Sequence, residues 1–261
     1  MNDELITPNP WQGLRRFTAA RLALGRAGNS LPTAAHLEFQ LAHARARDAV
    51  HLPFDDAELA AQLAAQGELP LLVQSAAPDR ASYLRRPDLG RQLNPTGQAL
   101  LAQHAAPENA PYDAVFVIAD GLSALAVHQN AIALLLLVAG ALRGAGWRLG
   151  PVVLACQARV ALGDQVGALL RAEQVAVLIG ERPGLSAADS LGVYLTYGPR
   201  PGRSDAERNC ISNIRPEGLS HDAAQQTLVY LMSQARRLRL TGVQLKDDRA
   251  GTDAAALEAS P

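Results

Sequence analysis

The chain has 261 residues and a formal net charge of -1, with 48% hydrophobic and 19% charged residues. This balance is typical of a folded globular protein and argues against nucleic-acid and membrane-surface binding, which would require a basic segment. The two cysteines, Cys156 and Cys210, lie far apart and predict neither a disulfide framework nor a zinc site, as expected in a reducing cytosol.

The first hundred residues are rich in Arg and Ala and predict a helical region. Helices are expected over residues 14–24, 33–47 and 55–66. Thr33 is placed as the N-cap of the second helix, and Asp55 and Glu58 give the third a capping-box-like start. Residues 78–95 are polar and contain three prolines, so we interpret them as an irregular connection.

After Pro111, short apolar runs alternate with helical segments. Strands are expected at residues 114–119, 147–155, 175–179, 192–197 and 210–214. Helices are expected at residues 130–145, 164–172 and 221–240, the last of them capped by Ser220 and Asp222. The apolar run at 131–142 is too short to span a bilayer, which needs about 20 residues, so we interpret it as a buried helix.

This alternation predicts the α/β class, with a Rossmann-like parallel sheet that has helices on both faces and follows a helical N-terminal region. We expect a helical region at residues 1–110, a Rossmann-like domain at 111–245 and a flexible tail at 246–261. The first ten residues lack the basic and apolar parts of a signal peptide, which favours the cytoplasm.

Ligands of such sheets bind at the carboxyl ends of the strands. Three segments follow predicted strands there: residues 120–123, residues 180–184 and the segment after Cys210. Turn and capping chemistry explains Gly121 and Ser123 without any ligand. Glu181 and Arg182 fit a local surface ion pair as well as they fit a ligand contact.

Motifs of self-sufficient catalysis are absent from the sequence. The glycines at 144, 146 and 150 follow a helix and precede a strand, the reverse of the dinucleotide-binding order. No P-loop, zinc-protease or nucleophile-elbow motif occurs, and the six histidines lack metal-ligand spacing. We therefore predict no catalytic residue and no metal ligand in this chain.

Six segments, in order, resemble the small (light) subunit of ethanolamine ammonia-lyase, and the resemblance covers residues 8–245. They are LRRFTAARLALGRAG (14–28), YLRRPDLGRQL (83–93), IADGLS (118–123), GERPGL (180–185), LGVYLTYGPR (191–200) and NCISNI (209–214).

The resemblance implies a radical enzyme that uses adenosylcobalamin to convert ethanolamine to acetaldehyde and ammonia. A large subunit, a β/α barrel, would hold the substrate, in a hetero-oligomer with six copies of each subunit. The small subunit would form one wall of the cobalamin site, and its helical N-terminal region would contact the large subunit. The sequence lacks the D-x-H-x-x-G motif of proteins that replace the cobalamin base by a histidine, which agrees with a base-on coenzyme.

The family's cobalamin contacts fall on three positions of this sequence. Val160 would pack against the coenzyme, Glu181 would accept hydrogen bonds from its peripheral groups, and Cys210 would make a small contact that does not involve cobalt. Asp120, Ser123 and Arg182 are neighbours of this site by loop placement only.

The N-terminus lacks the longer extension that is associated with microcompartment packaging in many members of the family, so we expect a freely cytosolic enzyme. Two other classes of function stay open from the sequence: a self-sufficient α/β enzyme such as a nucleotide-binding oxidoreductase, and a non-catalytic scaffold that binds a partner protein.

Overall fold

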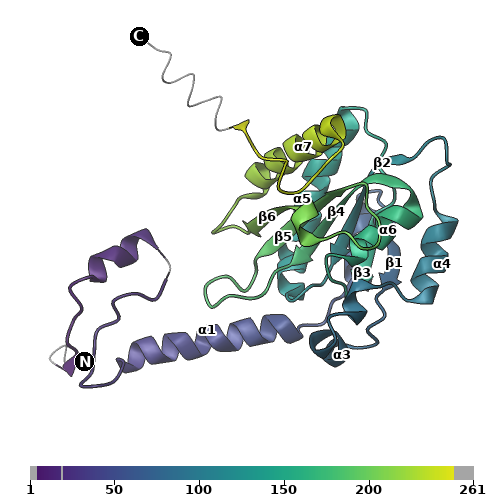
Figure 1. Cartoon of the computed structure of the whole chain (residues 1–261). Coiled ribbons are helices and arrows are strands. Elements are labelled where there is room, and N and C mark those ends of the chain that lie inside the picture. Colours follow the sequence, from purple (N-terminus) through teal and green to yellow (C-terminus); the bar gives the residue numbers. More distant parts are fainter. Residues whose placement is uncertain (1–4, 19, 250–261) are drawn as a thin grey trace, which may run out of the picture.

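The structure, a computed structural model, describes residues 5–18 and 20–249. It consists of an α/β body and an N-terminal arm, formed by residues 5–18 and 20–51, that projects from the body (Figure 1). Most of the predicted tail, residues 250–261, lies outside the described residues.

The body contains one six-stranded sheet in the order β1-β3-β2-β4-β5-β6. The strands are β1 (Leu71–Gln74), β2 (Tyr112–Ala119), β3 (Val153–Cys156), β4 (Ala172–Gly180), β5 (Leu191–Tyr197) and β6 (Asn209–Ile214). The α-helices are α1 (Thr33–His51), α2 (Asp56–Ala65), α3 (Arg80–Arg85), α4 (Pro95–Gln103), α5 (Ala124–Gly144), α6 (Leu162–Leu170) and α7 (His221–Leu238). Short 3-10 helices are η2 (Gln12–Phe17), η3 (Leu89–Arg91) and η4 (Asp205–Glu207).

The predicted α/β class, with helices on both faces of the sheet, is confirmed. The sheet is mixed rather than wholly parallel, because β5 runs antiparallel to both β4 and β6. Residues 181–190, which connect β4 to β5, are too few for a helical crossover of about a dozen residues, so the chain folds straight back.

The sequence interpretation was wrong in the N-terminal part at four points. Of the predicted helix over residues 14–24, residues 14–17 belong to η2, and residues 20–24 are irregular and lead to Arg26, which exchanges backbone hydrogen bonds of 2.8 and 2.9 Å with Thr7. Pro32, not Thr33, is the N-cap of α1. The segment interpreted as irregular contains α3 and η3, and the edge strand β1, which pairs with β3, was missed.

Capping predicted from local sequence is confirmed where side chains meet their own backbone. The Asp55 carboxylate accepts from the backbone N–H of Glu58 at 2.9 Å and begins α2. Ser220 begins α7 by accepting from Ala223 N at 3.3 Å.

The two faces of the sheet are covered to different extents. Helices α2, α5 and α7 pack on one face, from β3 to β6. Helices α4 and α6 pack on the other face, against β1 to β4. On that second side Tyr194 of β5 is half-buried, while Cys210 and Ser212 of β6 are exposed. We call this surface, formed by Tyr194, Cys210 and Ser212, the open face.

One helix, α5, is long and apolar enough to cross a bilayer by length and composition alone. Its apolar residues Leu134, Leu135, Val138 and Leu142 are buried in the core between the sheet and α7. The helix therefore belongs to the core of the body, as the interpretation of residues 131–142 as a buried helix requires.

Candidate functional site

The three residues expected to contact a coenzyme lie on the side of the sheet that carries α6. Val160 is half-buried in the loop between β3 and α6, where it packs against the core beneath that helix. Glu181 follows β4 directly. Cys210 lies in β6 opposite Tyr194 of β5, and Tyr194 in turn pairs with Val177 of β4.

Glu181 is fixed by three hydrogen bonds from two segments. Its carboxylate accepts from the hydroxyl of Ser190 at 2.5 Å, from the hydroxyl of Ser212 at 2.6 Å and from the backbone N–H of Asn213 at 3.3 Å. A carboxylate has about four lone-pair positions, so Glu181 keeps capacity for an outside donor.

Two backbone features make room for the Glu181 carboxylate. A Cβ atom on Gly192 would lie 2.8 Å from Glu181 Oε1, so a larger residue there would displace the carboxylate. In β6 the register shifts between its pairs with Leu191 and Val193, and Asn213 adopts a φ of 59°. Such an irregularity changes the direction of the backbone locally. Here the backbone N–H of Asn213, at the irregular position, donates to Glu181.

Cys210 is an exposed free thiol with one strong neighbour. Partial burial raises the pKa of the thiol, a hydrogen bond from the Tyr194 hydroxyl opposes that shift, and the Glu181 carboxylate adds to it. A raised pKa keeps the sulfur protonated near neutral pH, so Cys210 is suited to a contact and not to nucleophilic attack. The structure therefore brings Glu181 and Cys210 together, whereas Val160 lies in a separate segment, the loop between β3 and α6.

In the loop after β2, the side chain of Asp120 is fully used in contacts with other parts of the protein. Buried Asp120 accepts from the backbone N–H groups of Gln157 and Ala158 at 3.0 and 2.9 Å, and from Arg80 at 3.2 Å. Burial raises the pKa of Asp120 to about 6, against the opposing effect of these donors. Asp120 thus holds the loop that carries Val160.

Ser123 and Arg182, the other two neighbours expected from loop placement, differ in their surroundings. Ser123 is buried, begins α5 by accepting from Ala126 N at 3.2 Å, and donates to Ala188 O at 2.7 Å. Arg182 is exposed, and among the described residues Glu181 is bound by the hydroxyl and amide donors above rather than by Arg182. The alternative of a local ion pair between Glu181 and Arg182 is therefore wrong.

The crevice between the ends of β2 and β4, where a doubly wound sheet commonly binds a nucleotide, is filled by backbone. Leu122 N donates to Gly180 O at 2.9 Å. A Cβ atom on Gly180 would lie 2.7 Å from Asp120 O and closer still to Ser123 O. This close approach explains Gly121 of the IADGLS motif and Gly180 of the GERPGL motif, and it disfavours a nucleotide-binding oxidoreductase.

Sequence reasoning missed the residues that orient the site. Ser190 and Ser212 bind Glu181, and Tyr194 binds Cys210. One signal was available for Ser212, because residues two apart on a strand lie on the same face, which places it beside Cys210.

Comparison with known proteins agrees with the resemblance in the sequence. The model of the ethanolamine ammonia-lyase light chain family matches residues 8–246. The small subunit of ethanolamine ammonia-lyase from Ralstonia nicotianae is 59% identical over 242 residues, which cover 93% of this chain and 90% of that protein.

The chain belongs to the ethanolamine ammonia-lyase small-subunit family.

Further members of this family include the small subunits from Azotobacter vinelandii, 57% identical over 93% of this chain and 90% of that protein, and from Xanthomonas campestris, 56% identical over 96% and 93%. Membership makes this chain an ammonia-lyase subunit, and the word "small" in the relatives' names implies a larger partner subunit. The matched region includes most of the N-terminal arm as well as the whole sheet.

Proposed function

We propose that this chain is the small subunit of an adenosylcobalamin-dependent ethanolamine ammonia-lyase and that its open face, with Val160 and Glu181, forms one wall of the cobalamin site. The large subunit would hold ethanolamine, which the assembled enzyme converts to acetaldehyde and ammonia. The observation that carries this proposal is the Glu181 carboxylate, fixed by three donors beside a part of the sheet that α4 and α6 leave uncovered.

The residues of this surface fit the coenzyme chemically. Glu181 is an oriented acceptor for an amide or hydroxyl group, Cys210 is small and neutral, and Tyr194 supplies a half-buried ring. The six histidines lie on or next to helices α1, α4, α5 and α7, and none lies in β4, β5, β6 or the residues between them, which supports a coenzyme that keeps its own base on cobalt. Bound adenosylcobalamin would supply the radical chemistry, while this subunit binds, orients and shields it.

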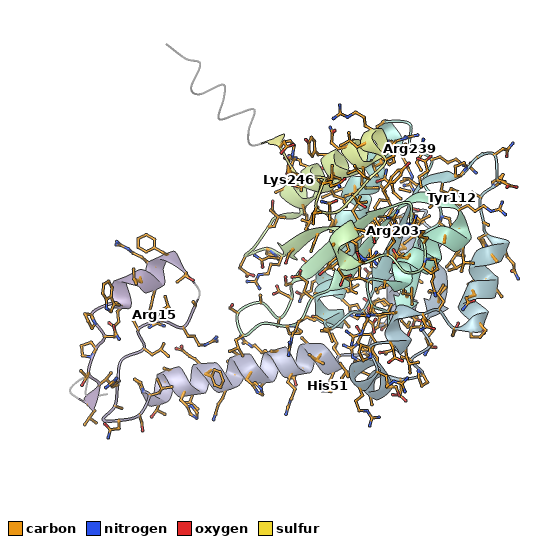
Figure 2. The ribbon with its side chains drawn as sticks, viewed as in Figure 1. Arg15, His51, Tyr112, Arg203, Arg239 and Lys246 are labelled. Atoms are coloured by element: carbon orange, nitrogen blue, oxygen red, sulfur yellow. The ribbon has the colours of Figure 1, made fainter. Side chains whose placement is uncertain are left out.

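The N-terminal arm has the chemistry of a docking surface for the large subunit. It exposes ten large apolar side chains: Leu5, Ile6, Trp11, Leu14, Phe17, Leu22, Leu31, Leu37, Phe39 and Leu41. Residues 5–32 contain four arginines and no acidic residue, and Arg15 lies on this arm in Figure 2. Such an apolar, basic surface favours a partner face that is apolar and acidic.

A groove of about 640 Å³ adjoins this arm where α1 meets the body, and α1, α5 and the loop at 185–189 line it. We propose that the large subunit covers the arm, in an assembly with six copies of each subunit.

The test is coexpression with a large subunit of the family, purification of the complex and titration with adenosylcobalamin. In the complex, Glu181→Ala should raise the apparent KM for the coenzyme about tenfold or more, because a hydrogen bond to a charged group contributes about 1.5–3 kcal/mol. The KM for ethanolamine should change less than about twofold.

Glu217→Ala is the matched control, because this exposed carboxylate pairs with Arg215 at 3.3 Å and not with any of the donors that hold Glu181. A coenzyme titration of Glu181→Ala that matches wild type would contradict the proposed wall. Ammonia release by this chain without a large subunit would favour the self-sufficient enzyme instead.

We also propose that the enzyme is cytoplasmic, which the two free thiols support. Recovery of the protein from inside purified microcompartment shells would contradict a freely cytosolic location.

A further inference from the structure

A buried ion pair lies behind the open face and joins α6 to the segment that enters β6. Arg208 Nη1 and Nη2 donate to the two carboxylate oxygens of Asp164 at 2.6 and 2.7 Å. Both side chains are only 2% exposed. This forked geometry is the most directional form of an arginine–carboxylate contact.

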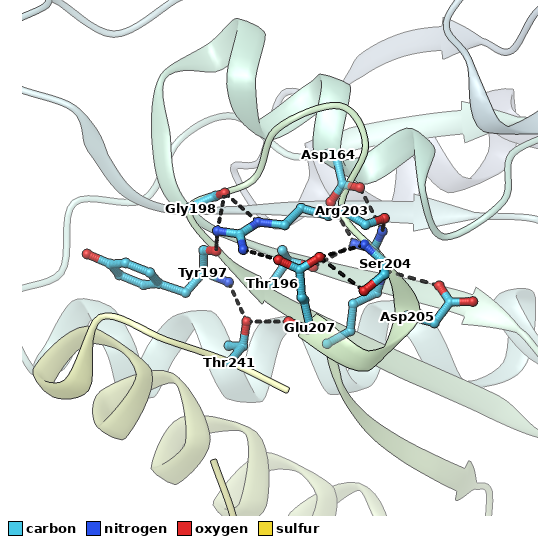
Figure 3. A network of polar contacts seen from close by, with 10 residues as sticks. Asp164, Thr196, Tyr197, Gly198, Arg203, Ser204, Asp205, Glu207 and Thr241 are labelled. Atoms are coloured by element: carbon cyan, nitrogen blue, oxygen red, sulfur yellow. Dashed lines mark hydrogen bonds and ion pairs between the residues drawn. The ribbon is translucent and has the colours of Figure 1, made fainter. Parts of the chain in front are cut away.

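The rest of the guanidinium binds the strands around it. Nη1 also donates to the hydroxyl of Thr196 on β5 at 2.9 Å, and Nη2 donates to the backbone oxygen of Arg203 at 3.0 Å. Arg203 in turn donates to the backbone oxygens of Tyr197 and Gly198 at 3.0–3.2 Å. The network therefore fixes the β5–β6 connection against α6, as Figure 3 shows.

Helix α6 is built to approach the sheet closely at this point. A Cβ atom on Gly167 would lie 2.5 Å from Cγ of Pro199, in the β5–β6 connection. Gly163 likewise leaves no room for a Cβ atom beside Val177 of β4. The close approach leaves the Asp164 carboxylate buried, where it needs a charged partner.

The position of the pair along the chain relates it to the proposed coenzyme wall. Asp164 lies four residues after Val160, about one helical turn, and Arg208 lies two residues before Cys210. The ion pair thus connects α6, which directly follows the loop that carries Val160, to the strand that carries Cys210.

Buried ion pairs contribute little net stability, since desolvating two charges offsets their attraction, and apolar residues of similar size often replace them without loss. What such a pair supplies is a fixed geometry. We infer that Arg208 and Asp164 are positioning residues that set the spacing between Val160 and Cys210 and thereby the affinity of the enzyme for adenosylcobalamin. This inference rests on the proposed function.

The experiment uses the complex of both subunits with Arg208→Lys, Asp164→Asn and the double variant Asp164→Met/Arg208→Met. Each is titrated with adenosylcobalamin and with ethanolamine, and its thermal midpoint is recorded. Lysine keeps the charge but not the fork. The control is Arg236→Lys, which alters a partly exposed pair with Asp113 (2.7 Å) on the far side of the body.

We expect the two single variants to raise the coenzyme KM about fivefold or more, with kcat at saturating coenzyme and the ethanolamine KM within about twofold. The double methionine variant separates geometry from stability. A wild-type thermal midpoint with a raised coenzyme KM supports positioning, whereas a wild-type coenzyme KM in that variant overturns it. If the double variant fails to fold, an unchanged coenzyme KM in Arg208→Lys overturns the inference equally.

Failure of this inference is distinguishable from failure of the proposed function. A wild-type complex that needs no adenosylcobalamin overturns both. A raised coenzyme KM in Glu181→Ala together with an unaltered one in the Arg208 and Asp164 variants overturns this inference alone.

Discussion

Glu181 is held by two hydroxyls and a backbone amide, whereas Cys210 meets one donor, the hydroxyl of Tyr194. The carboxylate is therefore oriented before any ligand arrives, and little conformational entropy is lost when a donor binds it. The thiol is limited in a different way, because its raised pKa leaves it neutral.

The state of Cys210 is open to a chemical test in the assembled enzyme. Iodoacetamide labelling of Cys210 should rise from about pH 7 to about pH 9 without a plateau, because the raised pKa keeps the thiolate scarce across this range. Saturating adenosylcobalamin should protect Cys210. Peptide mass spectrometry measures both effects.

Cys156 is the internal reference for this labelling. Burial and the neighbouring Asp56 raise its pKa to about 12, so it should label slowly and independently of the coenzyme. Equal labelling of Cys210 with and without coenzyme would contradict its place in the wall.

The sequence predicts contacts of single residues when the two partners are close together along the chain, and not when they are far apart. The caps at Asp55 and Ser220 follow from side chains that meet their own backbone three residues away. The partners of Glu181 come from residues 190, 212 and 213, and only the antiparallel pairing of β5 and β6 brings them there. No local pattern encodes that convergence.

Between elements, the tightest contact is that of the β2–α5 turn with the end of β4. Gly180→Ala should lower the free energy of unfolding by about 2 kcal/mol or more, because its Cβ would meet the backbone oxygens of Asp120 and Ser123, which cannot move away as a flexible side chain would. Urea unfolding of the free subunit measures the change.

Gly184→Ala, four residues further along the same loop, is the matched control, since the nearest atom to its Cβ is 3.8 Å away. Equal stability of the two variants would show that the contact is not tight in solution.

The helices and strands after residue 110 were predicted in type because their apolar runs are long and bounded by turn residues. The direction of β5 was not predicted, since it depends on the length of the β4–β5 connection. Strand β1 has four residues, one of them nearly half exposed, and carries too short a pattern to identify. The open face follows from the direction of β5, because it exists where the antiparallel strands β5 and β6 extend beyond α6.

At the scale of the whole molecule, we predict that the exposed apolar side chains of the N-terminal arm bind the large subunit. Trp11→Ser with Phe17→Ser should leave the thermal midpoint of the free subunit unchanged, because these side chains are 67% and 73% exposed. Association with the large subunit should weaken at least about tenfold if they anchor it. Analytical ultracentrifugation of mixed subunits measures the affinity.

Leu69→Ser, at a residue that is 79% exposed between α2 and β1, is the control for loss of apolar surface. Unchanged association of the Trp11 and Phe17 variant would show that the partner contacts another surface.

Helix α1 joins the rest of this arm to the body as a rod of 19 residues, roughly 28 Å long at 1.5 Å per residue. A rod of that length acts as a lever: a rotation of about 10° at its base would displace the far end by about 5 Å. Its base is held where the small side chains of Ala42, Ala46 and Ala49 are buried, with α1 packed against α5. The direction in which the arm projects from the body therefore depends on three alanine methyl groups. A larger side chain at Ala49 would tilt α1 and displace the exposed apolar residues several helical turns away, without contacting them.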